Sequence, residues 1–65
     1  MKNNDYQVSK IQPMHKPIEL AKQLNMSRAT MYRLLKSGKL GSVKVGGMRL
    51  VPEDEVFRLL SAAKD

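Results

Sequence analysis

Two short helical patterns, separated by a break at residues 25–27, constrain the fold of this 65-residue chain more than any other feature. In the first pattern the apolar residues recur at the spacing of one helix face: Leu20, Ala21 and Leu24. We expect this helix to begin at Pro17, because proline suits the first helical position. It is expected to end near Asn25, since asparagine tolerates the left-handed conformation that closes a helix. Two helices joined by so short a break indicate a helix-turn-helix motif.

The second helix is expected to start after Ser27, whose hydroxyl can accept the backbone N–H of Thr30 as an N-cap. Ser37 and Gly38 are expected to end it. One face of this helix is apolar and carries Met31, Leu34 and Leu35. The opposite face carries Ala29, Arg33 and Lys36, with Arg28 and Tyr32 beside them. The apolar face is therefore expected to pack in the core, and the opposite face to remain exposed.

Residues 42–51 alternate between apolar and polar on both sides of Gly46 and Gly47, which predicts a β-hairpin with a two-residue turn. In that register three pairs face each other: Val45 and Met48, Lys44 and Arg49, and Val43 and Leu50. We expect the four apolar residues to lie on the core face. Lys44 and Arg49 would then repel each other on the other face unless an anion lay across them. Removing either is therefore expected to leave thermal stability unchanged or slightly raised.

A third helix is expected from Pro52, with an apolar stripe formed by Val56, Leu59, Leu60 and Ala63. Its first turn holds Glu53, Asp54 and Glu55, and carboxylates favour the positive end of a helix dipole. The acidic cluster is thus explained without a catalytic role. Residues 1–14 are polar and lack clear periodicity, so we predict a flexible N-terminal arm in which residues 8–12 can form a short strand. Residues 15–65 are predicted to form one domain.

The charge distribution indicates a polyanionic partner. The formal net charge is +6, and no acidic residue lies between Glu19 and Glu53. The basic residues of that interval are Lys22, Arg28, Arg33, Lys36, Lys39, Lys44 and Arg49. A basic surface with charge gathered on separate elements is typical of proteins that bind nucleic acid.

Several other kinds of function are excluded or not expected. The chain has no cysteine and a single histidine, His15, so disulfides and thiolate metal sites are excluded and no metal site is expected. No second acidic group lies near the Glu53–Glu55 cluster in the sequence to form an acid–base pair with it. We therefore expect neither enzymatic activity nor a cofactor. No apolar run approaches the roughly 20 residues of a membrane span. We expect no membrane partner, and a location in the cytoplasm of a bacterial host cell or in association with its nucleoid.

Over twenty residues from Pro17, helix-turn-helix motifs place a small residue fifth, a turn residue ninth, and apolar residues eighth, tenth, fifteenth and eighteenth. This chain has Ala21, Asn25, Leu24, Met26, Met31 and Leu34 at those places. Together with residues 27–34, 37–40 and 45–52, the motif resembles the excisionase-type small DNA-binding domains, which are winged helix-turn-helix proteins related to the DNA-binding part of the MerR regulators. The resemblance extends from Pro17 to about Leu60. Gly47 and Met48 stand where this family often has basic residues in the wing.

The resemblance implies a mostly α fold with a small β-hairpin, in which the second helix enters a major groove of double-stranded DNA. The candidate base contacts are Arg28, Ala29 and Arg33, because an arginine fork can bond guanine and alanine can contact a thymine methyl group. The candidate phosphate contacts on this helix are Ser27, Tyr32 and Lys36. Lys44 and Arg49 are the candidate contacts of the wing.

The resemblance also implies a role in DNA recombination. An excisionase of a phage or other mobile element binds and bends DNA, and thereby directs a site-specific integrase toward excision. Cooperative self-association on DNA is expected, since one small domain contacts little DNA. Two alternatives remain open: a small transcription regulator of a phage or mobile element, and a winged-helix module that binds another protein. RNA binding is weaker, because the sheet lacks aromatic residues on which bases stack.

Overall fold

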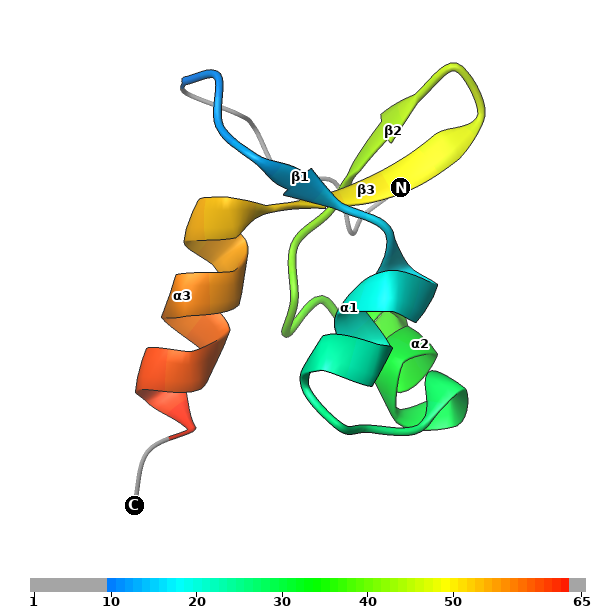
Figure 1. Cartoon of the computed structure of the whole chain (residues 1–65), viewed down its shortest axis with the longest axis vertical. Helices are drawn as coiled ribbons and strands as arrows, with labels where there is room; N and C mark the ends of the chain where they lie inside the picture. The colour runs from blue at the N-terminus through cyan, green and yellow to red at the C-terminus, as the bar shows by residue number, and fades with distance from the viewer. Residues whose placement is uncertain (1–9, 64–65) are drawn as a thin grey trace.

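The computed structural model describes residues 10–63, which form three helices and a small antiparallel sheet of three strands (Figure 1). The elements in chain order are β1 (Met14–His15), α1 (Pro17–Gln23), α2 (Arg28–Ser37), β2 (Val43–Val45), β3 (Met48–Pro52) and α3 (Glu53–Ala62). All three helices lie below the sheet in Figure 1, and the β2–β3 hairpin projects away from them. This arrangement is a winged helix-turn-helix, as the sequence predicts.

The local signals of the helix-turn-helix are confirmed. Pro17 is the first residue of α1, and Asn25 has a left-handed φ of 59° in the turn between the helices. Ser27 Oγ accepts the backbone N–H of Thr30 at 3.1 Å and so caps α2. Gly38 follows α2 with a φ of 83°, a left-handed conformation that glycine adopts without steric cost.

The hairpin has the predicted register: Val43 pairs with Leu50, Lys44 with Arg49, and Val45 with Met48. Gly46 and Gly47 both have positive φ values, of 55° and 85°, as a tight two-residue hairpin turn requires. The strand β1 was not expected from the sequence. It pairs with the far end of β3, with Met14 opposite Pro52 and His15 opposite Val51.

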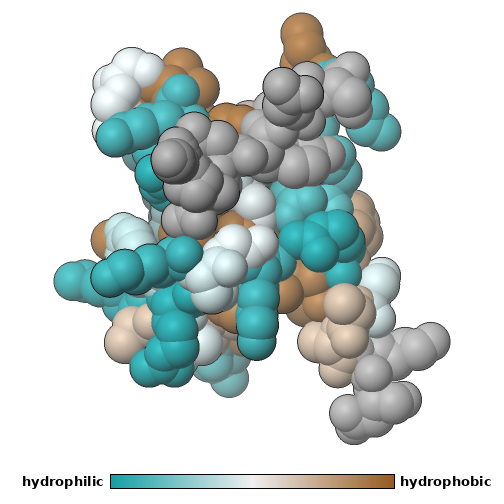
Figure 2. Space-filling model, turned by 180° about the vertical axis from the view of Figure 1, so that it is seen from behind, coloured by the Kyte–Doolittle hydropathy of each residue, from teal (hydrophilic) through white to brown (hydrophobic). Residues whose placement is uncertain are grey.

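The predicted core face of the hairpin is wrong. Val45 and Met48, expected inside, are 53% and 50% exposed. Within residues 42–51, the fully buried residues are Ser42 and Val51, which alternation places on the opposite face of the sheet. The reason is that the helices cover only the base of the hairpin, where Val51 joins the core, and leave its tip in solvent. Figure 2 shows the hydrophobic colour at the exposed hairpin.

The core joins both helices of the motif to the sheet. Its buried members are Leu20, Ala21, Met31, Leu35, Leu40 and Val51, and its partly buried members are Leu24, Met26, Leu34, Val56 and Leu59. The expected stripes of α1 and α2 are therefore confirmed. In α3, Val56 and Leu59 pack on the core as predicted. Leu60, which is 48% exposed, and Ala63, which follows the end of the helix and is also exposed, lie outside the core, so this part of the predicted stripe is wrong.

The segment before α1 is tied to α3. The Glu53 N–H donates to the Pro13 carbonyl at 3.0 Å, and the Asp54 N–H donates to the Gln12 side chain at 2.7 Å. His15 Nε2 and Glu53 Oε1 are 2.5 Å apart. Residues 12–14 of the expected arm make these contacts and part of β1. Residues 1–9 lie outside the described residues. Of the short strand expected at residues 8–12, residues 10–12 are described and form no strand, so this expectation is wrong there.

Candidate nucleic-acid interface

The outer face of α2 carries all the residues of this helix, with its N-cap, that the sequence analysis named as candidate DNA contacts. Met31 and Leu35 are buried, and this fixes the orientation of the helix on α1. The residues turned outward are Ser27, Arg28, Ala29, Tyr32, Arg33 and Lys36, all of which are exposed. Arg28, Tyr32 and Lys36 follow one another at four-residue steps, as do Ala29 and Arg33, so they form two adjacent rows.

These side chains differ in how free they are to contact a ligand. No side chain among residues 10–63 pairs with Arg28, Arg33 or Lys36, so their positive charges point to solvent without an internal partner. Ser27 is already engaged, since its hydroxyl accepts the Thr30 N–H and donates to Thr30 Oγ1 at 2.9 Å. Ser27 therefore contributes mainly by fixing the N-terminus of α2.

The β2–β3 hairpin is the wing of the fold, and its two candidate DNA contacts are in different environments. Lys44 is exposed, as expected for a residue that reaches a phosphate. Arg49 is half-buried, and its Nη1 donates to Ser42 Oγ at 2.7 Å. Because Ser42 is fully buried, Arg49 contributes to the base of the hairpin as well as to its charge.

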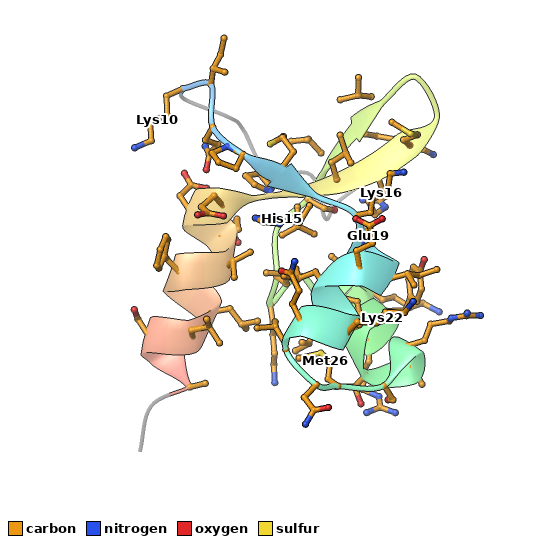
Figure 3. The ribbon with its side chains drawn as sticks, viewed as in Figure 1. Lys10, His15, Lys16, Glu19, Lys22 and Met26 are labelled. Atoms are coloured by element: carbon orange, nitrogen blue, oxygen red, sulfur yellow. The ribbon has the colours of Figure 1, made fainter. Side chains whose placement is uncertain are left out.

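A groove of about 440 Å³ runs between α1, α2 and the wing. Its lining includes Lys16 and Lys22 from the α1 side, Tyr32 from α2, and Met48 and Arg49 from the wing. Figure 3 shows Lys16, Glu19 and Lys22 along α1, and Figure 2 shows hydrophilic side chains gathered over the α1–α2 half of the molecule. A strand of DNA backbone that passes between α2 and the wing would meet this lining.

Lys16 and Lys22 were not assigned a functional role from the sequence. Lys22 belongs to the interval without acidic residues, which was an available signal, but nothing local connects it to Tyr32 or Arg49. Only the packing of α1 on α2 and β3 brings these residues to one groove. Glu19 also lines the groove and reduces its positive charge.

The link between α2 and the wing is held by α3. Glu55 is 4% exposed, and its Oε1 accepts the Gly41 N–H at 2.7 Å. Arg58 donates to both carboxylate oxygens of Glu55 and to the Lys39 carbonyl. The hydrogen bond from Arg58 lowers the pKa of Glu55 below its ordinary value, against the opposing effect of burial, and the Gly41 N–H lowers it further.

Two further features are absent from the part of the chain that the structure describes. Residues 10–63 contain no group of three His, Asp or Glu side chains that could hold a metal ion. None of the helices among them is long and apolar enough to cross a membrane.

The comparisons with known proteins agree with this geometry. A family model described as a helix-turn-helix domain matches residues 16–64. Searches of curated proteins and of solved structures gave no significant match. Because the family model covers α1, α2, the wing and α3, the chain belongs to this helix-turn-helix domain family, a small family of DNA-binding proteins that includes excisionase-like members.

Proposed function

We propose that this DNA-binding domain is an excisionase, which binds and bends DNA so that a site-specific integrase favours excision. The observation that carries the proposal is the outer face of α2. Arg28 and Arg33 are exposed there and have no side-chain partner among residues 10–63, and Tyr32 of the same face lines a groove shared with the wing. The family supports the finer role, since it includes excisionase-like proteins. The protein would act without catalysis, in the cytoplasm of a bacterial host of a phage or mobile element.

In this proposal α2 lies in the major groove as the recognition helix. Arg28 and Arg33 can each present a planar fork to guanine O6 and N7, and Ala29 is small enough to contact a thymine methyl group. Tyr32 and Lys36, in the row beside them, reach phosphates. Lys44 and Arg49 contact the backbone beyond the groove, where arginine also suits a narrow minor groove.

Arg33→Ala is expected to weaken binding to a site selected from a random pool by about 1–3 kcal/mol, and binding to unselected duplex much less. The reason is that the arginine fork reads a base, whereas a phosphate contact is insensitive to sequence. Gel shifts on both duplexes measure the difference. Lys36→Ala is the matched control, because it should weaken both by the same factor. Equal losses for Arg33→Ala would reduce Arg33 to a phosphate contact.

The small size of the domain favours cooperative binding of several copies of the protein to DNA. The described domain measures 31 × 22 × 22 Å, so one copy covers about one turn of B-DNA, which rises roughly 34–36 Å. Single modules of this kind bury roughly 600–1,000 Å² and select their sites weakly. Several copies on adjacent sites would share the cost of bending a site of 20–30 bp, about 1–6 kcal/mol. The curved DNA would then bring distant integrase sites together.

The architecture can be tested directly. We expect the free protein to sediment as a monomer. Footprinting on its natural DNA site should show that several copies bind adjacent direct repeats cooperatively and that the DNA is bent. A tight dimer on an unbent inverted repeat would reject the excisionase architecture and favour a transcription regulator. A folded protein that protects no DNA, but retains a protein partner, would favour the interaction module.

A further inference from the structure

We propose that Glu55 and Arg58 of α3 are positioning residues that hold the wing at a fixed place relative to the recognition helix, so that both contact DNA at once. The inference rests on the proposed roles of α2 and the wing in DNA binding. It assigns to α3 a function that neither its sequence pattern nor its packing on the core requires.

The link between the two DNA-contacting elements is residues 38–42. It leaves α2 through Gly38, whose N–H donates to the Leu35 carbonyl at 3.2 Å. In its middle Leu40 is fully buried, and its N–H donates to the Leu34 carbonyl at 3.2 Å. This end of the link is therefore fixed by α2 itself and by the core.

The remainder of the link is fixed by α3 on both sides of Leu40. Before Leu40, the Lys39 carbonyl accepts from Arg58 Nη2 at 2.7 Å. After Leu40, the Gly41 N–H donates to Glu55 Oε1 at 2.7 Å. The same Oε1 accepts from Arg58 Nη2 at 2.7 Å, and Arg58 Nε donates to Oε2 at 3.0 Å. Two side chains on one helix turn thus hold two peptide groups of the link.

The hydrogen bonds continue from the link into the wing. Ser42, which follows Gly41, is fully buried and accepts from Arg49 Nη1 of β3 at 2.7 Å. A displacement of Gly41 would therefore move the strand β2 and, through Ser42 and Arg49, its partner β3. Glu55 is 4% exposed and has no surface to offer DNA, so any effect of Glu55 on binding must pass through this link.

A double-mutant cycle in DNA binding tests the proposal. Lys44→Ala should weaken binding by about five- to tenfold at 0.1 M salt, since one neutralised phosphate contributes a salt exponent of about 0.9. Arg58→Met keeps the unbranched apolar stem of the side chain but removes the donors to Lys39 and Glu55. If Arg58 places the wing, Arg58→Met should weaken binding by a similar factor, and the double variant should be little weaker than either single variant.

Two further measurements separate positioning of the wing from a direct contact between Arg58 and DNA. Arg33→Ala, on the recognition helix, is the control for the double-mutant cycle. The loss of DNA affinity in the Arg33→Ala/Arg58→Met double variant should equal the product of the two single losses, because Arg33 does not depend on the position of the wing. In the free protein, the amide NMR signals of Gly46 and Gly47 should shift in Arg58→Met and remain unchanged in Lys36→Ala. Glu55→Gln, which keeps an acceptor for the Gly41 N–H, should shift them less than Arg58→Met does.

The possible failures are distinguishable. If Lys44→Ala weakens binding equally with and without Arg58→Met, and the hairpin signals do not shift, the positioning role is wrong while the DNA-binding role of the wing stands. If Lys44→Ala has no effect on binding in the otherwise unchanged chain, the wing does not contact DNA and the positioning proposal fails with it.

Discussion

Glu55→Ala is expected to lower the free energy of unfolding by about 1.5–3 kcal/mol, which is the usual contribution of hydrogen bonds to a charged group. The Glu55 carboxylate is buried and accepts from both Gly41 and Arg58, so its removal leaves the Gly41 N–H without this partner inside the fold. In a domain of this size the midpoint of thermal unfolding should fall by about 10 °C. Thermal unfolding followed by circular dichroism measures the change.

The same residue should give the protein an acid-sensitive stability. The pKa of Glu55 is lowered in the folded state from an ordinary value of 4.5, chiefly by the hydrogen bond from Arg58. A group whose pKa is lower when folded contributes its full stability above the unfolded value. That contribution is lost as the pH falls from about 4.5 through the folded pKa. Unfolding curves between pH 7 and pH 3 should show this loss.

Glu55→Gln separates the charge from the packing. The glutamine still offers an oxygen to the Gly41 N–H but cannot titrate, so the part of the acid dependence that belongs to Glu55 should disappear. Glu19→Gln, at an exposed position on α1, is the control and should retain the original acid dependence. An unchanged acid dependence in Glu55→Gln would show that the bond to Arg58 contributes nothing measurable to folding.

Features with local causes were predictable from the sequence. The cap at Ser27, the turn at Asn25 and the helix end at Gly38 each depend on a few neighbouring residues, and all are observed. The register of the hairpin was also predictable, because two glycines fix the turn and the turn fixes the pairing. Helical spacing alone also determines which residues share the exposed face of α2. Its basic and aromatic members are Arg28, Tyr32, Arg33 and Lys36.

Features with distant causes were not predictable. Alternation in a strand shows that two faces differ but not which one the helices will cover, so Val51 and Ser42 were not identified as the buried residues. The strand β1 has two residues and no pattern of its own, and it forms only because β3 offers an edge. Glu55 looked like its neighbours in an acidic first turn, and its partner Gly41 lies fourteen positions away. Its spacing of three from Arg58 was the one readable sign of an ion pair.

Arg49→Ala is expected to destabilise the domain by about 1.5–3 kcal/mol, whereas Lys44→Ala should change its stability by no more than about 0.5 kcal/mol. From the sequence alone the two residues were equivalent, as like charges facing each other on one side of a hairpin. The structure separates them. Arg49 donates a charge-assisted hydrogen bond to the buried hydroxyl of Ser42, while Lys44 is exposed. Removing Lys44 relieves repulsion and leaves no buried group unsatisfied.

Thermal unfolding of the two variants, together with the salt dependence of DNA binding, tests this difference. Each alanine variant should reduce the slope of binding against salt by about one unit, since each loses one phosphate contact. Arg49→Lys should restore that slope but not the stability, because an ammonium group lacks the planar fork that reaches Ser42. In a Ser42→Ala background, Arg49→Ala should cost much less, as the hydrogen bond is already absent. If Arg49→Ala instead unfolds at the original temperature, the bond to Ser42 does not hold the hairpin, and Arg49 serves only as the surface charge that the sequence suggested.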